Sequence, residues 1–166
     1  MNYDYIIKNG TVMDFKQNVF LKKDIYVQKG RIVEENPSAE AEEIIDAEGN
    51  YVLPGLIDLH AHYFYGGNNL GINADLICPA QGITTSIDAG SAGPMNFEAF
   101  YRDGILNSMT EIKAYLNIMP EGVKAGYKHG ECCDPEDMDY DEILGFFKAY
   151  PDTIKGLKLR ISKETT

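Results

Sequence analysis

The chain has 166 residues, 44% hydrophobic and 25% charged, a composition typical of a globular domain and not of a disordered or fibrous protein. Its 26 acidic and 15 basic residues give a formal net charge of −11, which argues against nucleic acid and anionic membranes as partners. The N-terminus lacks signal-peptide features, no run is long enough to span a bilayer, and the three cysteines suggest no disulfide framework, so we expect a cytoplasmic protein.

Residues 1–50 are predicted to form a small β-sandwich segment. Short alternating runs are separated by Asn9-Gly10 and Lys29-Gly30, dipeptides typical of hairpin turns. An acidic, turn-rich stretch follows at 35–50, and the pattern changes at Tyr51. We therefore place a domain boundary between residues 50 and 51.

Residues 51–166 alternate between predicted strands and helices. The apolar runs expected to be strands lie at 56–62, 82–90, 111–119 and 156–162. Helix-like stretches lie between them, near 73–81, 96–107 and 139–150. Strands and helices repeating in this way predict an α/β fold with a parallel sheet.

Two of the predicted strands carry polar side chains on one face. Alternation places Asp58, His60 and His62 on one side of 56–62, and it places Lys158 and Arg160 on one side of 156–162. Buried parallel strands usually read as continuous hydrophobic runs. The polar faces therefore predict a site within the sheet.

His60 and His62 are candidate metal ligands. Two imidazoles two residues apart on a strand can reach one cation of the zinc, iron or manganese type. Lys158 is a poor ligand as an ammonium, but as a neutral amine it could take up carbon dioxide and form a carbamate that bridges two metals. The alternative for Lys158 is a solvated side chain on an edge strand.

The string from Val52 to His62, VLPGLIDLHAH, together with Gly82-Ile83-Thr84-Thr85, resembles the amidohydrolase superfamily. Further segments resemble its deacetylase branch, which is related to dihydroorotases and was formerly named adenine deaminase. These segments are 88–93, 96–97, 116–118 and 156–160.

The resemblance implies a metal-dependent hydrolase on a (β/α)8 TIM barrel with a small β-sandwich. His60 and His62 would bind one divalent metal, with zinc as the expected ion, and a carboxylated Lys158 would be the catalytic ligand that bridges it to a second metal. A metal-bound hydroxide would then attack an amide, cyclic amide or ester bond of a small molecule. Asp58 would be a buried carboxylate that fixes the orientation of an imidazole ligand or a nearby backbone group, or it would be purely structural.

The resemblance also implies ligands that this sequence does not contain. The family pattern continues with two histidines and an aspartate from later strands, and a complete barrel needs about 250 residues. We therefore expect residues 51–166 to be the first half of the barrel, with its first four strands, and the chain as given to be truncated and inactive alone. An uncovered last strand would favour a homo-oligomer.

Other polar residues are weaker candidates. Arg160 follows Lys158 by two residues and could pair with a substrate carboxylate, which favours a small anionic substrate. Ser91 and Asn117 lie near predicted strand ends, where barrel sites are built. His129, Cys132 and Cys133 form a local cluster without a fourth metal ligand, so we give it no metal role.

Three alternatives remain open at this point. The first is a single-metal deaminase acting on adenine or cytosine, which would need no carboxylated Lys158. The second is a non-catalytic barrel scaffold, in which His60 or His62 would be expected to be missing. The third is an interaction module that functions at this length.

Overall fold

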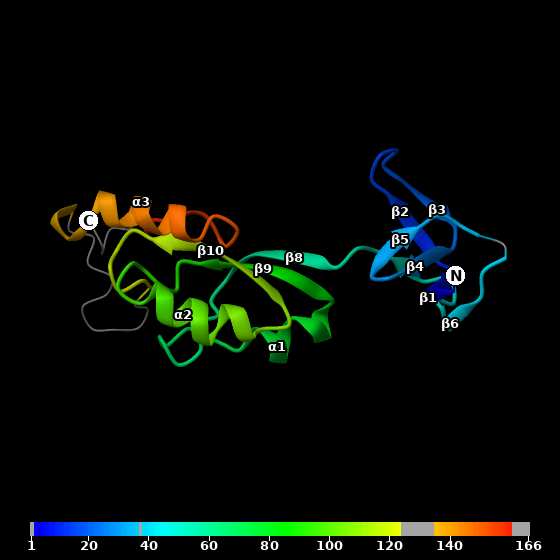
Figure 1. The fold of residues 1–166 in the computed structure, drawn as a ribbon, viewed down its shortest axis with the longest axis horizontal. Coiled ribbons are helices and arrows are strands. Elements are labelled where there is room, and N and C mark those ends of the chain that lie inside the picture. The colour runs from blue at the N-terminus through cyan, green and yellow to red at the C-terminus, as the bar shows by residue number, and fades with distance from the viewer. Residues whose placement is uncertain (1, 37, 124–134, 161–166) are drawn as a thin grey trace. The chain divides into compact units, whose positions relative to one another are not determined.

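A computed structural model describes residues 2–36, 38–123 and 135–160. The chain divides into two compact units, Met1–Pro54 and Gly55–Thr166, which are described separately below (Figure 1). The division lies after Pro54 and not before Tyr51, because the short strand at Tyr51–Val52 pairs with Thr11 and Val12 of the first unit. Among the described residues, no helix is long and apolar enough to cross a membrane.

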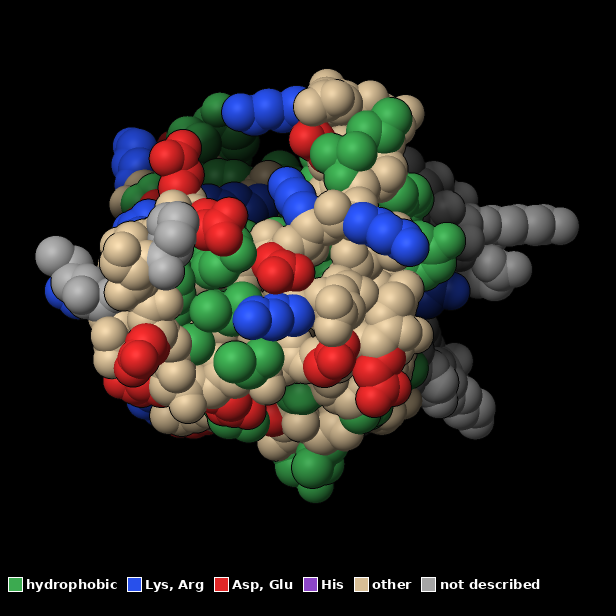
Figure 2. All heavy atoms as spheres, turned by 90° about the vertical axis from the view of Figure 1, so that its right-hand side faces the viewer, with side chains coloured by type: hydrophobic (Ala, Val, Ile, Leu, Met, Phe, Trp, Pro, Cys, Tyr) green, Lys and Arg blue, Asp and Glu red, His purple; other side chains and the backbone are tan. Residues whose placement is uncertain are grey.

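The first unit contains two small sheets. One has the order β5-β4-β1-β6 and the other has the order β3-β2-β7. The strands are β1 (Tyr3–Lys8), β2 (Thr11–Asp14), β3 (Val19–Lys22), β4 (Ile25–Gln28), β5 (Arg31–Val33), β6 (Ala41–Asp46) and β7 (Tyr51–Val52). Figure 2 shows that hydrophobic side chains on the face it presents are interspersed with acidic and basic ones.

One of the two predicted hairpins is present. Lys29 and Gly30 both have positive φ, at 51° and 68°, and they join the antiparallel strands β4 and β5. Asn9 also has a positive φ, but the strands on its two sides pair with other partners: β1 with β4 and β6, and β2 with β3 and β7. The hairpin prediction at Asn9-Gly10 was therefore wrong, because the chain changes sheets there.

The second unit is a parallel four-stranded sheet with the order β11-β10-β9-β8. Its strands are β8 (Leu56–Ala61), β9 (Ile83–Ala89), β10 (Glu111–Asn117) and β11 (Ile154–Lys158). Its helices are α1 (Ala74–Ile77), α2 (Phe97–Asp103) and α3 (Tyr140–Ala149), with 3-10 turns at Pro79–Gln81, Ile105–Asn107 and Pro135–Asp137. The α/β class with a parallel sheet is confirmed.

One face of this sheet is packed against helices. Ile112, Ala114 and Leu116 alternate along β10 and are buried with Phe97 of α2 and Ile143 of α3. The ring centroids of Phe97 and Phe146 lie 5.8 Å apart, so α2 and α3 meet over the same face. The opposite face of the sheet is where side chains can gather into a site.

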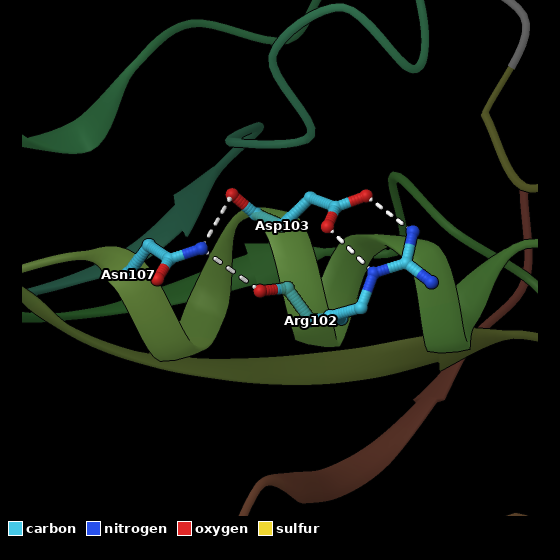
Figure 3. Close-up of polar contacts among 3 residues, drawn as sticks. All are labelled: Arg102, Asp103 and Asn107. Carbon is cyan, nitrogen blue, oxygen red and sulfur yellow. Dashed lines mark hydrogen bonds and ion pairs between the residues drawn. The ribbon is translucent and has the colours of Figure 1, made fainter.

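Local signals account for the helix boundaries. The Asn73 and Asp139 side chains accept hydrogen bonds from Asp75 N and Glu142 N, which caps the starts of α1 and α3. Figure 3 shows the end of α2, where Nδ2 of Asn107 donates to the carbonyls of Arg102 and Asp103. Arg102 and Asp103 also form an exposed ion pair at 2.6 Å there.

Candidate metal centre

His60 and His62 come together at the end of β8. Their ring centroids lie 5.9 Å apart, with the ring planes nearly perpendicular at 84°. His60 is exposed and is the penultimate residue of the strand, while His62 is partly buried just beyond it. Two imidazoles at this spacing can offer two nitrogen ligands to one cation.

An irregularity in β8 sets the directions of these side chains. Asp58 pairs with Ser86, whereas Ala61, three residues later, pairs with Asp88 only two residues further along β9. The extra residue in β8 is a bulge, a feature that changes the direction of a side chain and is frequent next to active sites. Oδ1 of Asp58 accepts a hydrogen bond from the backbone N–H of His60 at 3.0 Å.

The bulge corrects the predicted faces. Ser86 and Asp88 lie on one side of β9, so their partners Asp58 and Ala61 share that side. The prediction that Asp58 shares a face with His60 and His62 was therefore wrong. Strict alternation fails here because one residue of β8 has no partner on β9.

A second irregularity places Lys158. Ala114 pairs with Ile154 and Tyr115 with Gly156, so one residue of β11 is extra between them. Lys158 consequently pairs with Asn117 and lies on the face away from Ile154, which is buried under the helices. Lys158 is the last residue of β11 and is partly buried, while Arg160 is exposed beyond the strand.

Lys158 passes directly over the turn that follows β9. A Cβ atom on Gly90 would lie 2.5 Å from both Cβ and Cγ of Lys158, and Gly90 has a φ of 84°. The turn thus requires a glycine for its backbone conformation and for the close approach of the lysine. This approach is one that the sequence pattern alone did not indicate.

The pKa of His62 is lowered by its surroundings. Burial makes the largest contribution, and the positive charges of His60 and Lys158 act in the same direction. A neutral imidazole is the form that binds a metal. Lys158, which ends the opposite edge strand of the sheet, thus acts electrostatically on His62.

A buried carboxylate behind His62 was missed by the sequence reasoning as part of the site. Asp88 is fully buried, and its two oxygens accept hydrogen bonds from Tyr63 N and Ser91 N, each at 2.7 Å. Burial raises the pKa of Asp88, while these N–H donors act against the rise. The signal in the sequence was a single carboxylate within the otherwise uncharged run ITTSIDAG.

Ser91 and Asn117, the two weaker candidates, also lie at this end of the sheet. The Ser91 hydroxyl is 2.9 Å from Nδ1 of His62. Asn117 donates through Nδ2 to the carbonyl of Gly90 and accepts through Oδ1 from Met119 N. The Ser91 and Asn117 side chains therefore act on the turns that surround Lys158 and His62.

The donor set suits part of a divalent-metal site. Two imidazoles lie close together and Lys158 acts electrostatically on one of them, but the described residues hold no group of three or more His, Cys, Asp or Glu placed for a metal. His129, Cys132 and Cys133 lie outside the described residues. A structural zinc needs four protein ligands and a catalytic zinc three, so the two imidazoles supply part of such a ligand set.

Comparison with known proteins gives this site a context. Residues 43–116 match the amidohydrolase family. A deacetylase of Agrobacterium fabrum is 39% identical over 122 residues, covering 74% of this chain and 30% of that protein. A deacetylase of Enterococcus faecalis is 32% identical over 165 residues, covering 98% of this chain and 42% of that protein. A dihydroorotase of Bacillus thuringiensis is 32% identical over 156 residues, covering 91% of this chain and 36% of that protein.

Solved structures agree in fold over nearly the whole chain. A structure of an adenine deaminase superposes with a TM-score of 0.82 and 29% identity, covering 99% of this chain and 43% of that one. A structure of a dihydroorotase superposes with a TM-score of 0.78 and 32% identity, covering 98% of this chain and 44% of that one. The chain spans between 30% and 42% of the length of the three curated relatives above.

Proposed function

Because this chain carries an amidohydrolase-family domain, matched over residues 43–116, we propose that it belongs to a metal-dependent hydrolase of amide, cyclic amide or ester bonds in small molecules. The observation that carries the proposal is the pair of imidazoles, 5.9 Å apart at the end of a parallel strand, with Lys158 acting on one of them. The sheet itself is proposed to be the first part of a (β/α)8 barrel, whose sites form where strands end.

Each ligand has a proposed role. His60 and His62 would hold one divalent cation, with zinc as the expected metal, through ring nitrogens. The Lys158 amine would add to carbon dioxide and release a proton, and the carbamate would bridge to a second cation. Bound divalent cations supply Lewis acidity toward a carbonyl and lower the pKa of bound water to about 7.

The chain's own groups would orient this chemistry. Asp88 ties the backbone after β8 to the turn after β9, which keeps His62 near Ser91. Gly90 leaves room for Lys158 to reach the same end of the sheet. Because Arg160 lies two residues beyond Lys158, its guanidinium is proposed to pair with a substrate carboxylate.

The substrate class follows from that pairing and from the relatives. The deacetylases and the dihydroorotase suggest an N-acyl or O-acyl acid or a cyclic ureide acid. The similarity to an adenine deaminase structure supports one alternative, a single-metal deaminase in which Lys158 stays unmodified. A non-catalytic scaffold is disfavoured because both histidines are present.

An activity panel on the whole protein separates these functions. We expect zinc-dependent release of acetate from N-acetyl or O-acetyl acids, or opening of a cyclic ureide acid, with activity lost to a chelator and recovered with Zn²⁺. Release of ammonia from adenine, with no turnover of the acids, would favour the deaminase. Turnover that persists after complete metal removal would contradict the proposal.

Arg160→Met tests the anionic-substrate part of the proposal. Loss of the bidentate pair should raise KM for acidic substrates much more than for their neutral amide analogues. Arg102→Met is the matched control, because Arg102 is an exposed arginine that pairs with Asp103 at the end of α2. Equal losses on acidic and neutral analogues would contradict a carboxylate-binding role for Arg160.

A further inference from the structure

The contact between Ser91 and His62 is fixed by the backbone on both sides. Ser91 is fully buried in the turn after β9, and its Oγ lies 2.9 Å from Nδ1 of His62. The Asp88 carboxylate accepts from the N–H of Ser91 and from the N–H of Tyr63, the residue next to His62. These two backbone hydrogen bonds to Asp88 therefore help to fix the position of the Ser91 hydroxyl relative to the His62 imidazole, in addition to the rotamers of the two side chains.

The direction of the hydrogen bond follows from the groups around Ser91. A serine hydroxyl has one proton and two acceptor lone pairs. Hydrogen bonding from the Ser91 side chain is among the effects that lower the pKa of the Asp88 carboxyl, against the larger rise caused by burial, and both Asp88 oxygens accept backbone N–H groups at 2.7 Å. An ionised carboxylate is a stronger hydrogen-bond acceptor than a neutral imidazole nitrogen, so the Ser91 hydroxyl donates its proton to Asp88 and not to His62. The Ser91 oxygen is then left to accept a proton from Nδ1 of His62.

We propose that Ser91 is a positioning residue that holds His62 in the Nδ1–H tautomer and so leaves the Nε2 lone pair for a divalent cation. The inference rests on the proposed metal-binding role of His62. A neutral imidazole binds a metal only through the nitrogen that lacks the proton. Histidine ligands commonly donate their other N–H to a protein acceptor, and loss of that acceptor costs about 10- to 100-fold in metal affinity.

The tautomer can be read without any metal or substrate. Ring ¹⁵N chemical shifts of the metal-free, ¹⁵N-labelled protein report which nitrogen carries the proton, and His62→Gln assigns the signals. The measurement is made at about pH 8, above the ordinary histidine pKa of about 6.5. We expect a protonated Nδ1 in the wild type and a shift to the Nε2–H form in Ser91→Ala. Zinc affinity, measured by competition with a chromophoric chelator, should fall about 10- to 100-fold in that variant.

Ser86→Ala is the matched control. Ser86 is a second fully buried serine of the same segment, on β9, and its Oγ lies 2.9 Å from the Tyr63 hydroxyl and 3.2 Å from the Asp58 carbonyl. We expect this variant to lose some stability while the His62 tautomer and the zinc affinity stay as in the wild type. Equal effects of the two substitutions on the tautomer would reduce Ser91 to a structural role and overturn the proposal.

Two results distinguish this inference from the proposed function. A wild-type His62 in the Nε2–H form, or a tautomer unchanged in Ser91→Ala, would overturn the positioning role whatever the metal does. Zinc affinity undiminished in His62→Gln would instead overturn the metal role of His62. The tautomer measured in the metal-free protein would stand in that case.

Discussion

His62 is the residue at which burial and charge act most clearly together. Burial, then His60, then Lys158 lower its pKa in the folded protein, so the folded state favours the neutral ring. The unfolded chain, with a histidine pKa of about 6.5, binds the proton more readily below that pH. Stability from His62 is therefore present above about pH 6.5 and is lost as the pH falls toward the lowered folded value.

Urea unfolding of the metal-free protein tests this pH dependence. We expect the free energy of unfolding to fall between about pH 7.5 and pH 5.5, and to fall less in His62→Gln, which has no proton to bind at this position. A wild type and a variant with the same pH dependence would contradict the assigned direction. The difference between the two proteins isolates His62 from the other titrating groups.

Lys158 is the residue that separates a two-metal hydrolase from a single-metal deaminase. If its carbamate bridges two cations, Lys158→Ala should lose most activity, and short-chain carboxylates in the buffer should restore part of it by occupying the same place. Lys155→Ala is the matched control from the same strand, where the exposed Lys155 ammonium donates to the Pro151 carbonyl. A fully active Lys158→Ala would favour the deaminase.

At the scale of elements, the turn after β9 depends on Gly90. An alanine there must adopt a φ of 84° and place its Cβ 2.5 Å from the Lys158 side chain. Gly66→Ala is the control, because Gly66 has a similar φ of 77° but no atom within 4 Å of the added Cβ. We expect both variants to lose about 1–2 kcal/mol from backbone strain.

Only Gly90→Ala should also displace Lys158. The expected additional results are a larger loss of stability than in Gly66→Ala and a loss of metal content that Gly66→Ala does not share. Urea unfolding and elemental analysis of the two variants measure these effects. Equal stability and equal metal content in both would show that the approach of Lys158 to Gly90 has no consequence for the site.

The elements were largely predictable because hydrophobic periodicity is a local property. The four apolar runs of the second unit became β8 to β11, although the run predicted at 156–162 is a strand from Ile154 to Lys158. The helix-like stretches at 73–81 and 96–107 were each predicted as one segment, but Pro79 and Gly104 divide them into a short helix and a 3-10 turn. Proline and glycine in these positions were the available signal.

The faces of the strands were less predictable, because they depend on register between strands. The extra residues in β8 and β11 put Asp58 beside Ser86 and separate Lys158 from Ile154. The bulge in β8 has no mark in the sequence of its strand, whereas the bulge in β11 lies next to Gly156, and a glycine inside a strand often marks a bulge. The hydrogen bonds that Asp88 accepts from Tyr63 N and Ser91 N were unpredictable for the same reason. Tyr63 lies 25 positions before Asp88 in the sequence, and Ser91 lies 3 positions after it.

At the scale of the molecule, β8 and β11 are the edge strands of the second unit's sheet. Both carry large apolar side chains that are exposed, with Ile57 61%, Leu59 63% and Leu157 51% exposed. Edge strands of this kind invite pairing with further protein. We propose that additional polypeptide, either a second copy or further barrel, covers them in the functional protein.

Light scattering on the 166-residue polypeptide tests that proposal. We expect a mass above that of a single chain, or aggregation, and no appreciable hydrolase activity, because the ligands from this segment would hold a second cation only through the bridge. The relatives found by comparison are more than twice as long as their matched parts, with matches covering 30–42% of them. A monodisperse monomer with zinc-dependent turnover would contradict the expectation.

Metal content of the whole protein tests the central claim most directly. The account predicts about two divalent ions per chain in the wild type, and the loss of at least one in His60→Ala and in His62→Ala, because either change leaves too few ligands. His129→Ala, which removes the third histidine of the sequence, is the control and should keep both ions. Elemental analysis that finds the same occupancy in the wild type and in both His60→Ala and His62→Ala would contradict the account.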